Sequence, residues 1–274
     1  MGRVTARKPV LRIRDGQRST RPDTLTVEEP MELRVAGRPL TITMRTPGHD
    51  FDLAAGFLVG EGVVRRAEDV AGIRYCAGAT TDSGNTYNIV DVALAPGVAA
   101  PDASLERNFY TTSSCGLCGK ASLDAVRTQT TWPVADDPLR ISASTLSTLP
   151  EQLRAAQRVF DSTGGLHAAA LFTSDGELIC LREDVGRHNA VDKVVGHALR
   201  EGRLPLRDTV LMVSGRASFE LVQKAVTAGV PILAAVSAPS SLAVDLAQDA
   251  GLTLVGFLRG TSMNVYAGAE RVVV

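Results

Sequence analysis

The residues with the most evident chemistry are two cysteines three positions apart, Cys115 and Cys118, in the sequence SCGLCG of residues 114–119. The residues after Lys120 are expected to form a helix, and the positive end of a helix dipole favours a thiolate over a thiol. The Lys120 cation acts in the same direction. Flanking glycines leave the sulfur atoms uncrowded. We therefore predict an accessible loop with a reactive thiolate.

Three kinds of site use such a cysteine pair. A closed zinc site needs two further ligands. The other cysteines, Cys76 and Cys180, are isolated among mainly apolar neighbours, so we expect them to be structural. A thioredoxin-like redox pair normally follows the first strand of a small domain, whereas this pair lies in the middle of the chain. The third possibility is a sulfur carrier, in which one thiolate holds a persulfide. The pair alone disfavours zinc and leaves the other two functions open.

Composition excludes several classes of protein. The chain has 274 residues, of which 45% are hydrophobic and 22% charged, and its formal net charge is −1. Such a balance creates no global field for nucleic acid or for a membrane surface. No apolar run approaches the roughly 18 residues of a membrane-spanning helix, and no signal-peptide pattern opens the chain. Four cysteines without a framework spacing suit a reducing compartment. We expect a cytoplasmic protein that binds neither nucleic acid nor membrane.

The elements that must position the thiols fall into two units. Residues 1–24 are polar and basic with little periodicity, which predicts a flexible N-terminus. Residues 25–110 are predicted to form a small α+β domain, in which Asp50 is the N-cap of a helix. Its expected elements are strands at 31–35, 40–44, 73–75 and 88–94 and a helix at 51–59.

Residues 111–274 are predicted to form a larger α/β domain that carries the thiol loop. Thr148 and Glu151 have the spacing of a capping box and are expected to open a helix that ends at Phe160. Alternating helices and continuously apolar strands indicate a mainly parallel sheet covered on both faces, that is, three α/β/α layers. The expected strands are 168–172, 177–181, 209–213, 231–236 and 252–258, and the expected later helices are 189–199, 218–228 and 241–250.

Ligands bind such sheets beyond the carboxyl ends of the strands. Here the loops at that edge are small, polar and basic. Backbone N–H groups, hydroxyls and guanidinium groups are suited to a phosphate, although turns and helix caps use similar residues. No P-loop sequence occurs. His49, His167 and His197 are expected to be structural or solvated. The candidate binding residues in the loops are Arg187, His188, Ser214, Gly215, Arg216, Ser240 and Arg259.

A zinc deaminase is disfavoured, although a similar sheet remains possible. That chemistry requires His-x-Glu followed by Pro-Cys-x-x-Cys. His188 is followed by Asn189 and Ala190 rather than by a glutamate, and Ser114 stands where the proline is needed.

Several separated motifs stand out along the chain: Thr46–Asp50, Gly56–Leu58, Ser113–Gly119, Arg182–Lys193, Ser214–Arg216, Ala238–Ser241 and Gly256–Gly260. Together they resemble one known family, the formate dehydrogenase accessory sulfurtransferases (FdhD). The resemblance extends from about residue 25 to the end of the chain.

The resemblance implies a cytoplasmic homodimer whose larger domain has a cytidine-deaminase-like fold without the zinc chemistry. It implies a sulfurtransferase that receives sulfur from a cysteine desulfurase, with the persulfide on Cys115. The acceptor is the molybdenum or tungsten bis(molybdopterin guanine dinucleotide) cofactor of the formate dehydrogenase catalytic subunit. GDP would be a fragment of that ligand. The alternatives are a cofactor-binding chaperone that transfers no sulfur and a dithiol oxidoreductase. The implied cofactor-binding segment is Phe257, Leu258, Arg259, Gly260, Thr261 and Ser262.

Overall fold

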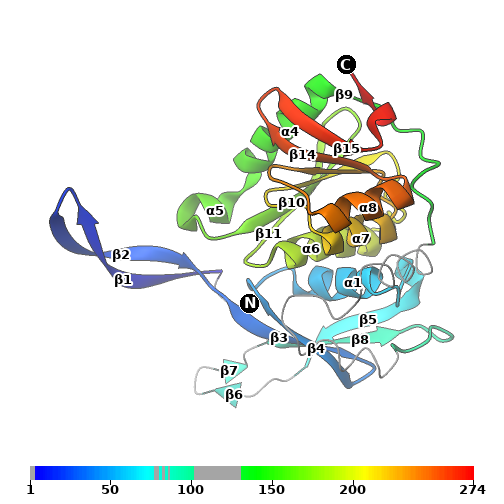
Figure 1. Ribbon diagram of the computed structural model, residues 1–274. Coiled ribbons are helices and arrows are strands. Elements are labelled where there is room, and N and C mark those ends of the chain that lie inside the picture. The colour runs from blue at the N-terminus through cyan, green and yellow to red at the C-terminus, as the bar shows by residue number, and fades with distance from the viewer. Residues whose placement is uncertain (1–3, 77–79, 82–83, 86, 102–130) are drawn as a thin grey trace.

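The centre of the fold is a six-stranded mixed sheet from the C-terminal half of the chain (Figure 1). The computed structural model describes residues 4–76, 80–81, 84–85, 87–101 and 131–274. The three inner strands that follow one another in the chain run parallel, and their neighbours are antiparallel. In spatial order the strands are β11 (Leu178–Asp184), β10 (His167–Thr173), β12 (Thr209–Val213), β13 (Ile232–Ala235), β14 (Thr253–Arg259) and β15 (Ser262–Ala267).

Helices cover both faces of this sheet, as the apolar strands predicted. One face carries α6 (Arg187–Arg200), α7 (Phe219–Thr227) and α8 (Ser241–Ala250), and the other carries α4 (Ala143–Ala156) with α5 (Arg158–Thr163) (Figure 1). Alternate residues of a strand therefore enter different cores. On β10, Ala169 and Leu171 pack on the α6 side, whereas Ala168, Ala170 and Phe172 pack on the α4 side. The three-layer prediction is confirmed for this part of the chain; its likeness to cytidine deaminases stays a prediction.

A smaller sheet and one helix form the second unit, as predicted. Its strands are β4 (Arg38–Arg45), β3 (Glu29–Val35), β8 (Ile89–Leu94) and β5 (Val70–Tyr75), in that order. Helix α1 (Asp50–Gly60) lies between this sheet and α6 (Figure 1). The shorter elements are η1 (Ala67–Asp69), η2 (Ala269–Arg271) and the paired strands β6 (Thr80–Thr81) with β7 (Gly84–Asn85) and β9 (Ile141–Ser142) with β16 (Val272–Val273).

The two units meet where α1 crosses α6, and two glycines make this contact possible. A Cβ atom at Gly56 of α1 would overlap the carbonyl oxygen of Asp192, and one at Gly196 of α6 would overlap that of Asp52. The two helix backbones are thus in direct contact. Buried residues of both units, such as Leu53 and Val195, belong to one continuous hydrophobic core.

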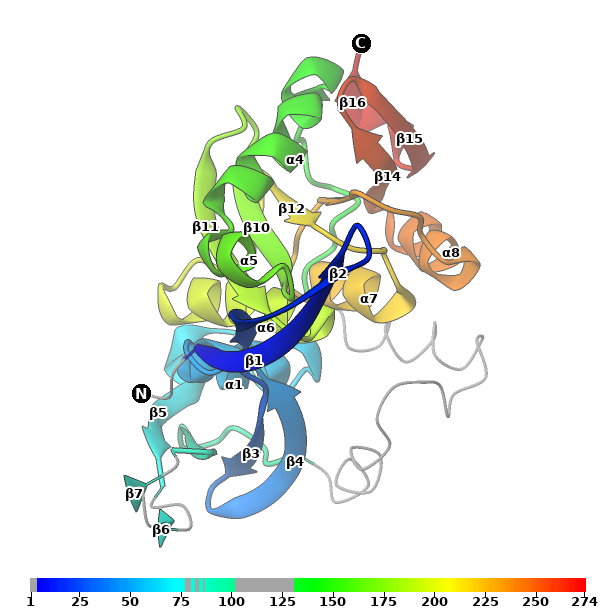
Figure 2. The ribbon, with the colours of Figure 1, turned by 90° about the vertical axis from the view of Figure 1, so that its left-hand side faces the viewer.

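The N-terminal segment differs from the prediction. Instead of an irregular start, residues 5–26 form an antiparallel hairpin, β1 (Thr5–Arg14) and β2 (Gln17–Thr26), which projects from the body (Figures 1 and 2). Most of its side chains are exposed, so its strands lack the apolar alternation by which half-buried strands are recognised. Asp15 and Gly16 occupy its turn with positive φ, which is a hairpin signal that the prediction overlooked.

Two further elements differ from the prediction. Helix α4 begins at Ala143 rather than near Thr148, with Ser142 as its N-cap, and Pro150 lies inside it. The buried stripe of Leu146, Leu149 and Leu153 extends to both sides of the proline, and its packing offsets the missing backbone hydrogen bond. The predicted continuation to Phe160 is a separate helix, α5. Strand β15 was not predicted.

Candidate functional site

The carboxyl ends of β11, β12, β13 and β14 meet at one edge of the large sheet. The antiparallel pairs His167–Asp184 and Ala169–Val213 also bring the first residue of β10 to this edge. The four polar loops predicted as a binding region therefore lie side by side. We call this region the strand-end edge.

Backbone hydrogen bonds join these loops to one another. Ser237 N donates to Gly215 O over 3.3 Å, and Ser240 N donates to Ala217 O over 3.0 Å. The two candidate serines, Ser214 and Ser240, also accept hydrogen bonds from the backbone. Ser214 Oγ accepts from Ala168 N at 2.9 Å, and Ser240 Oγ caps α8 by accepting from Ala243 N at 3.3 Å. The edge is therefore held in place before any ligand binds.

The candidate cations have different surroundings. His188 Nε2 lies 3.3 Å from Ser218 Oγ and 3.6 Å from Glu220 Oε2, so its ring is turned toward α7. The hydrogen bond with His188 is the main reason that the pKa of Glu220 falls to about 2. Arg187, the first residue of α6, has a buried Nε atom without a hydrogen-bond partner among the described residues. Arg216 is exposed.

The segment implied to bind the cofactor comprises the last three residues of β14, the turn and the first residue of β15. Phe257 is exposed and has a φ of 51°, whereas Leu258 is fully buried. Arg259 is exposed at the edge, and its Nε donates to the carbonyl oxygen of Val236 over 3.1 Å. Gly260, Thr261 and Ser262 are exposed. Their side chains and backbone are thus accessible to a ligand, with Leu258 as the exception.

Two adjoining cavities lie at the strand-end edge. The first, which we call the edge cavity, has a volume of about 640 Å³. The second, the outer groove, measures about 540 Å³ and is lined by Leu258 and Arg259. Both cavities share Pro150, Arg154 and Val236 as walls. Of the predicted site residues, Ser214 lines the edge cavity. Arg187, His188, Gly215, Arg216 and Ser240 lie at the same edge outside these two cavities.

Of the residues that line the edge cavity, only Ser214 was a predicted site residue; Gln157 and His167 are among those that were not identified from the sequence. His167 was expected to be structural, but it lines the cavity. Burial is the main reason that the pKa of His167 is lowered, and the nearby charges of Arg187 and His188 lower it further. Its imidazole is therefore neutral near pH 7, with one donor and one acceptor nitrogen.

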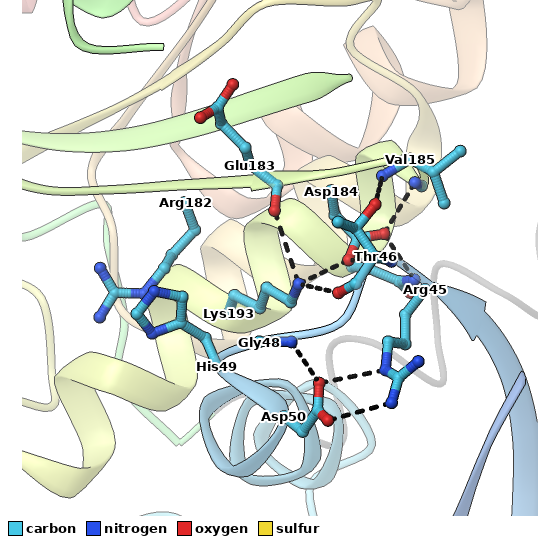
Figure 3. Close-up of polar contacts among 12 residues, drawn as sticks. Arg45, Thr46, Gly48, His49, Asp50, Arg182, Glu183, Asp184, Val185 and Lys193 are labelled. Carbon is cyan, nitrogen blue, oxygen red and sulfur yellow. Dashed lines mark hydrogen bonds and ion pairs between the residues drawn. The ribbon is translucent and has the colours of Figure 1, made fainter. Parts of the chain in front are cut away.

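A buried ionic network lies directly behind the edge (Figure 3). The carboxylate of Asp184 accepts from Lys193 Nζ at 2.6 Å and from Thr46 N at 3.1 Å. It also accepts from Gly186 N at 2.8 Å and from Asn189 Nδ2 at 3.0 Å. Lys193 Nζ donates in addition to Thr46 O at 2.9 Å. Asp184 thus ties the loop that leads into α6 to the small unit.

The beginning of α1 contributes a second ionic cluster to this network. Arg45 donates two hydrogen bonds of 3.1 Å to Asp50, and Arg182 binds Asp52 at 3.0 Å (Figure 3 shows the first pair). Burial alone would raise the pKa of Asp52, but hydrogen bonds from His49, Arg200 and Arg182 hold it well below its usual range. The N-cap of α1 is His49, with a φ of 55°, rather than the predicted Asp50.

The cysteines divide into two groups. Cys115 and Cys118 lie outside the described residues, as does the helix predicted after Lys120. The described residues on either side, Pro101 and Thr131, line one cavity together with Arg65 and Arg66. Cys180 is buried, and burial raises the pKa of its thiol, as suits a structural residue.

Fold and site together define a class of protein: a layered α+β protein with a pre-formed polar edge at the strand ends of its large sheet. The chain belongs to the FdhD/NarQ family, whose model matches residues 26–273. The resemblance inferred from the motifs is thereby confirmed. Among the described residues, no helix is both long enough and apolar enough to cross a membrane.

Relatives match over nearly their whole length. The chain is 71% identical to the "Sulfur carrier protein FdhD" of Streptomyces coelicolor, over 99% of this chain and 97% of the relative. It is 59% identical to the protein of the same name from Mycobacterium tuberculosis, over 99% and 100%, and 43% identical to that of Sulfolobus acidocaldarius, over 96% of each.

A solved structure shares the fold. It is a crystal structure of a protein from Desulfotalea psychrophila that is provisionally described as a formate dehydrogenase accessory protein. The TM-score is 0.76 at 24% identity, with 99% of this chain and 100% of that chain covered.

Proposed function

We propose that this chain is a sulfur carrier that receives persulfide sulfur on Cys115 and delivers it to a pterin guanine dinucleotide cofactor of molybdenum or tungsten. The observation that carries the proposal is the full-length similarity, up to 71% identity, to proteins named as sulfur carriers, in a chain that has the Cys115–Cys118 pair. As part of the same proposal, the donor is a cysteine desulfurase, the client is the formate dehydrogenase catalytic subunit, and two copies act as a cytoplasmic homodimer.

The chemistry consists of two sulfur transfers. First, the thiolate of Cys115 attacks the outer sulfur of the donor's persulfide, so that a new S–S bond forms and the donor cysteine leaves as a thiolate. Then the S–S bond on Cys115 breaks, the outer sulfur bonds to the acceptor, which supplies both electrons of the new bond, and Cys115 leaves as a thiolate. The chain is neither oxidised nor reduced over the cycle. Cys118 assists by exchange or by helping release.

The strand-end edge supports the cofactor part of the proposal. The cargo is a large anion with pyrophosphate groups, and guanidinium groups bind phosphate through charge-assisted hydrogen bonds. Arg259 presents an exposed guanidinium there. Two buried donor atoms, Nε2 of Gln157 and Nε of Arg187, have no partner among the described residues. Because buried polar groups are normally satisfied, these atoms favour a ligand at this edge.

The test of the carrier function is mass spectrometry after incubation with a cysteine desulfurase and cysteine. We expect a peptide that contains Cys115 to gain about 32 Da, the mass of one sulfur atom. Cys115→Ala should abolish this gain and the activation of formate dehydrogenase, whereas Cys118→Ala should keep part of both. Cys76→Ser is the control that should behave as the wild type.

Two outcomes would favour the other functions. If Cys115→Ala still yields active formate dehydrogenase in cells that lack the native protein, the chain is a cofactor-binding chaperone. If the protein instead reduces insulin at thioredoxin-like rates without a detectable persulfide, it is a dithiol oxidoreductase.

A further inference from the structure

The edge cavity contains a polar side chain that the fold leaves unsatisfied. Gln157 joins α4 to α5 and is only 3% exposed. Its backbone is fully used, because its N–H donates to Arg154 O and its carbonyl accepts from Asp161 N. The side-chain Nε2, however, has no hydrogen-bond partner among the described residues, although Gln157 lines the cavity. A buried amide without a partner costs stability unless a ligand satisfies it.

The remaining walls of the edge cavity suit a flat, uncharged ring. Phe160, Val185 and Val236 provide apolar surface, while Ser214 and the neutral His167 provide polar groups. The guanidinium of Arg154 lies 4.7 Å from the centre of the Phe160 ring, which fixes that ring in place. Apolar walls with a few placed polar groups are typical of sites for small heterocyclic ligands.

The neighbouring outer groove offers a different chemistry. Val236 is a wall of both cavities, and its carbonyl oxygen holds the side chain of Arg259 at the boundary. A ligand with its ring in the edge cavity therefore passes Val236 and meets a guanidinium next. Arg154, a wall of both cavities, is paired with Asp161 and stacked on the Phe160 ring, whereas Arg259 is an exposed guanidinium. A ring site followed by the Arg259 cation matches a base followed by its phosphates.

We propose that the edge cavity holds the base of a nucleotide, that the buried amide of Gln157 donates to an acceptor atom on the base, and that Arg259 holds the attached phosphates. The inference rests on the proposed function, since the cargo is a dinucleotide, and adds the residue that selects its base. If the Nε2 donor faces the 6-position of the base, it favours the keto oxygen of guanine over the amino group of adenine, which offers no acceptor there.

Calorimetric titration of the full chain with GDP, ADP and pyrophosphate tests the proposal. The wild type should bind GDP more tightly than ADP. Gln157→Met should weaken GDP binding by about three- to tenfold, the effect of one neutral hydrogen bond, and should reduce the preference over ADP. It should leave pyrophosphate binding unchanged. Arg259→Ala should weaken both GDP and pyrophosphate.

The matched control is Gln152→Met on the same helix. Gln152 lies outside the edge cavity, and its Nε2 already donates to Thr148 Oγ1 over 3.0 Å. Gln157→Glu is the second variant; it keeps the shape but replaces the donor with an acceptor, so it should lose GDP binding at least as strongly. Because the Gln157 amide is unpaired, Gln157→Met should not lower the melting temperature of the ligand-free protein.

A wrong role for Gln157 and a wrong cofactor site give different experimental results. If the wild type binds GDP and Arg259→Ala weakens it, but Gln157→Met equals Gln152→Met, then Gln157 does not contact the base and the proposed function is unaffected. If the wild type does not bind GDP at all, the cofactor site of the proposed function is wrong and this inference is wrong with it.

Discussion

The buried pair of Asp184 and Lys193 gives the most informative test of how the site is supported. Both side chains are almost completely inaccessible, at 0% and 1% exposure. We consider Asp184→Asn, Lys193→Met and the double variant. Breaking one partner of a buried ion pair costs about 3–5 kcal/mol, because the other charge is left without compensation.

The two single variants should lose different amounts of unfolding free energy. Without Lys193, the Asp184 carboxylate keeps three hydrogen-bond donors, Thr46 N, Gly186 N and Asn189 Nδ2. Lys193→Met should therefore lower the free energy of unfolding by about 3 kcal/mol. Asp184→Asn leaves the Lys193 ammonium with carbonyl oxygens only and turns an amide NH₂ toward groups that themselves donate. Asp184→Asn should therefore lower the free energy of unfolding by about 5 kcal/mol.

Urea unfolding followed by circular dichroism measures these free energies. The double variant should lose less stability than the sum of the two single losses, by about 2 kcal/mol or more, because both substitutions remove the same contact. The pair Arg74–Asp91 supplies the control, because the Arg74 side chain is 76% exposed and the buried Asp91 keeps a hydrogen bond from Gly37 N. Arg74→Met should therefore cost below about 1 kcal/mol. A loss for Asp184→Asn no larger than that of Arg74→Met would refute the reasoning.

Three further predictions concern single elements. Gly56→Ala should destabilise the protein by at least about 2 kcal/mol in the same assay, because its methyl group meets backbone, whereas Gly72→Ala, with open space around it, should change stability little. The pKa of Glu220 is lowered from 4.5 to about 2, chiefly by the hydrogen bond with His188. This contact therefore stabilises the fold above pH 4.5, and the stabilisation is lost as the pH falls toward 2. Glu220→Gln should flatten that part of the profile of stability against pH. Ser142→Ala should cost about 1 kcal/mol, measured as a shift in urea midpoint, through loss of the α4 cap.

The elements that could be predicted from the sequence are those whose burial is reflected in the local pattern of apolar residues. Residues 209–213 were assigned as a strand with both ends correct, because all five are buried and no polar residue interrupts them. The helix that ends at Ala250 was equally clear, with Gly251 after it, although its N-cap is Ser240 rather than the expected Ser241. The start of α4 was misplaced because Thr148 and Glu151 imitate a helix start and Pro150 suggests one. Strand β15 was overlooked because its first residue, Ser262, was assigned to the ligand-binding segment, although exposed Asn264 between Met263 and Val265 has the alternation of a half-buried strand.

The site was predictable in outline but not in detail. Parallel strands bring their carboxyl ends together, so the convergence of the four loops followed from strand order alone. Gln157 could not be identified in this way, because an unsatisfied amide depends on everything packed around it. Asp184 and Lys193 were noticed only as parts of a motif, since charged residues are buried only when paired, and the partners of this pair are fixed by the fold.

The contact of Gly56 with α6 has a mechanical consequence. Helix α6 starts at the strand-end edge with Arg187 and reaches the contact at Gly196, nine residues or about 13 Å further along its axis. At this contact no side chain separates α1 from α6, so a shift of one helix along the other would bring their backbones into collision. A hinge between the small and the large sheet would therefore have to separate two helix backbones that are in direct contact.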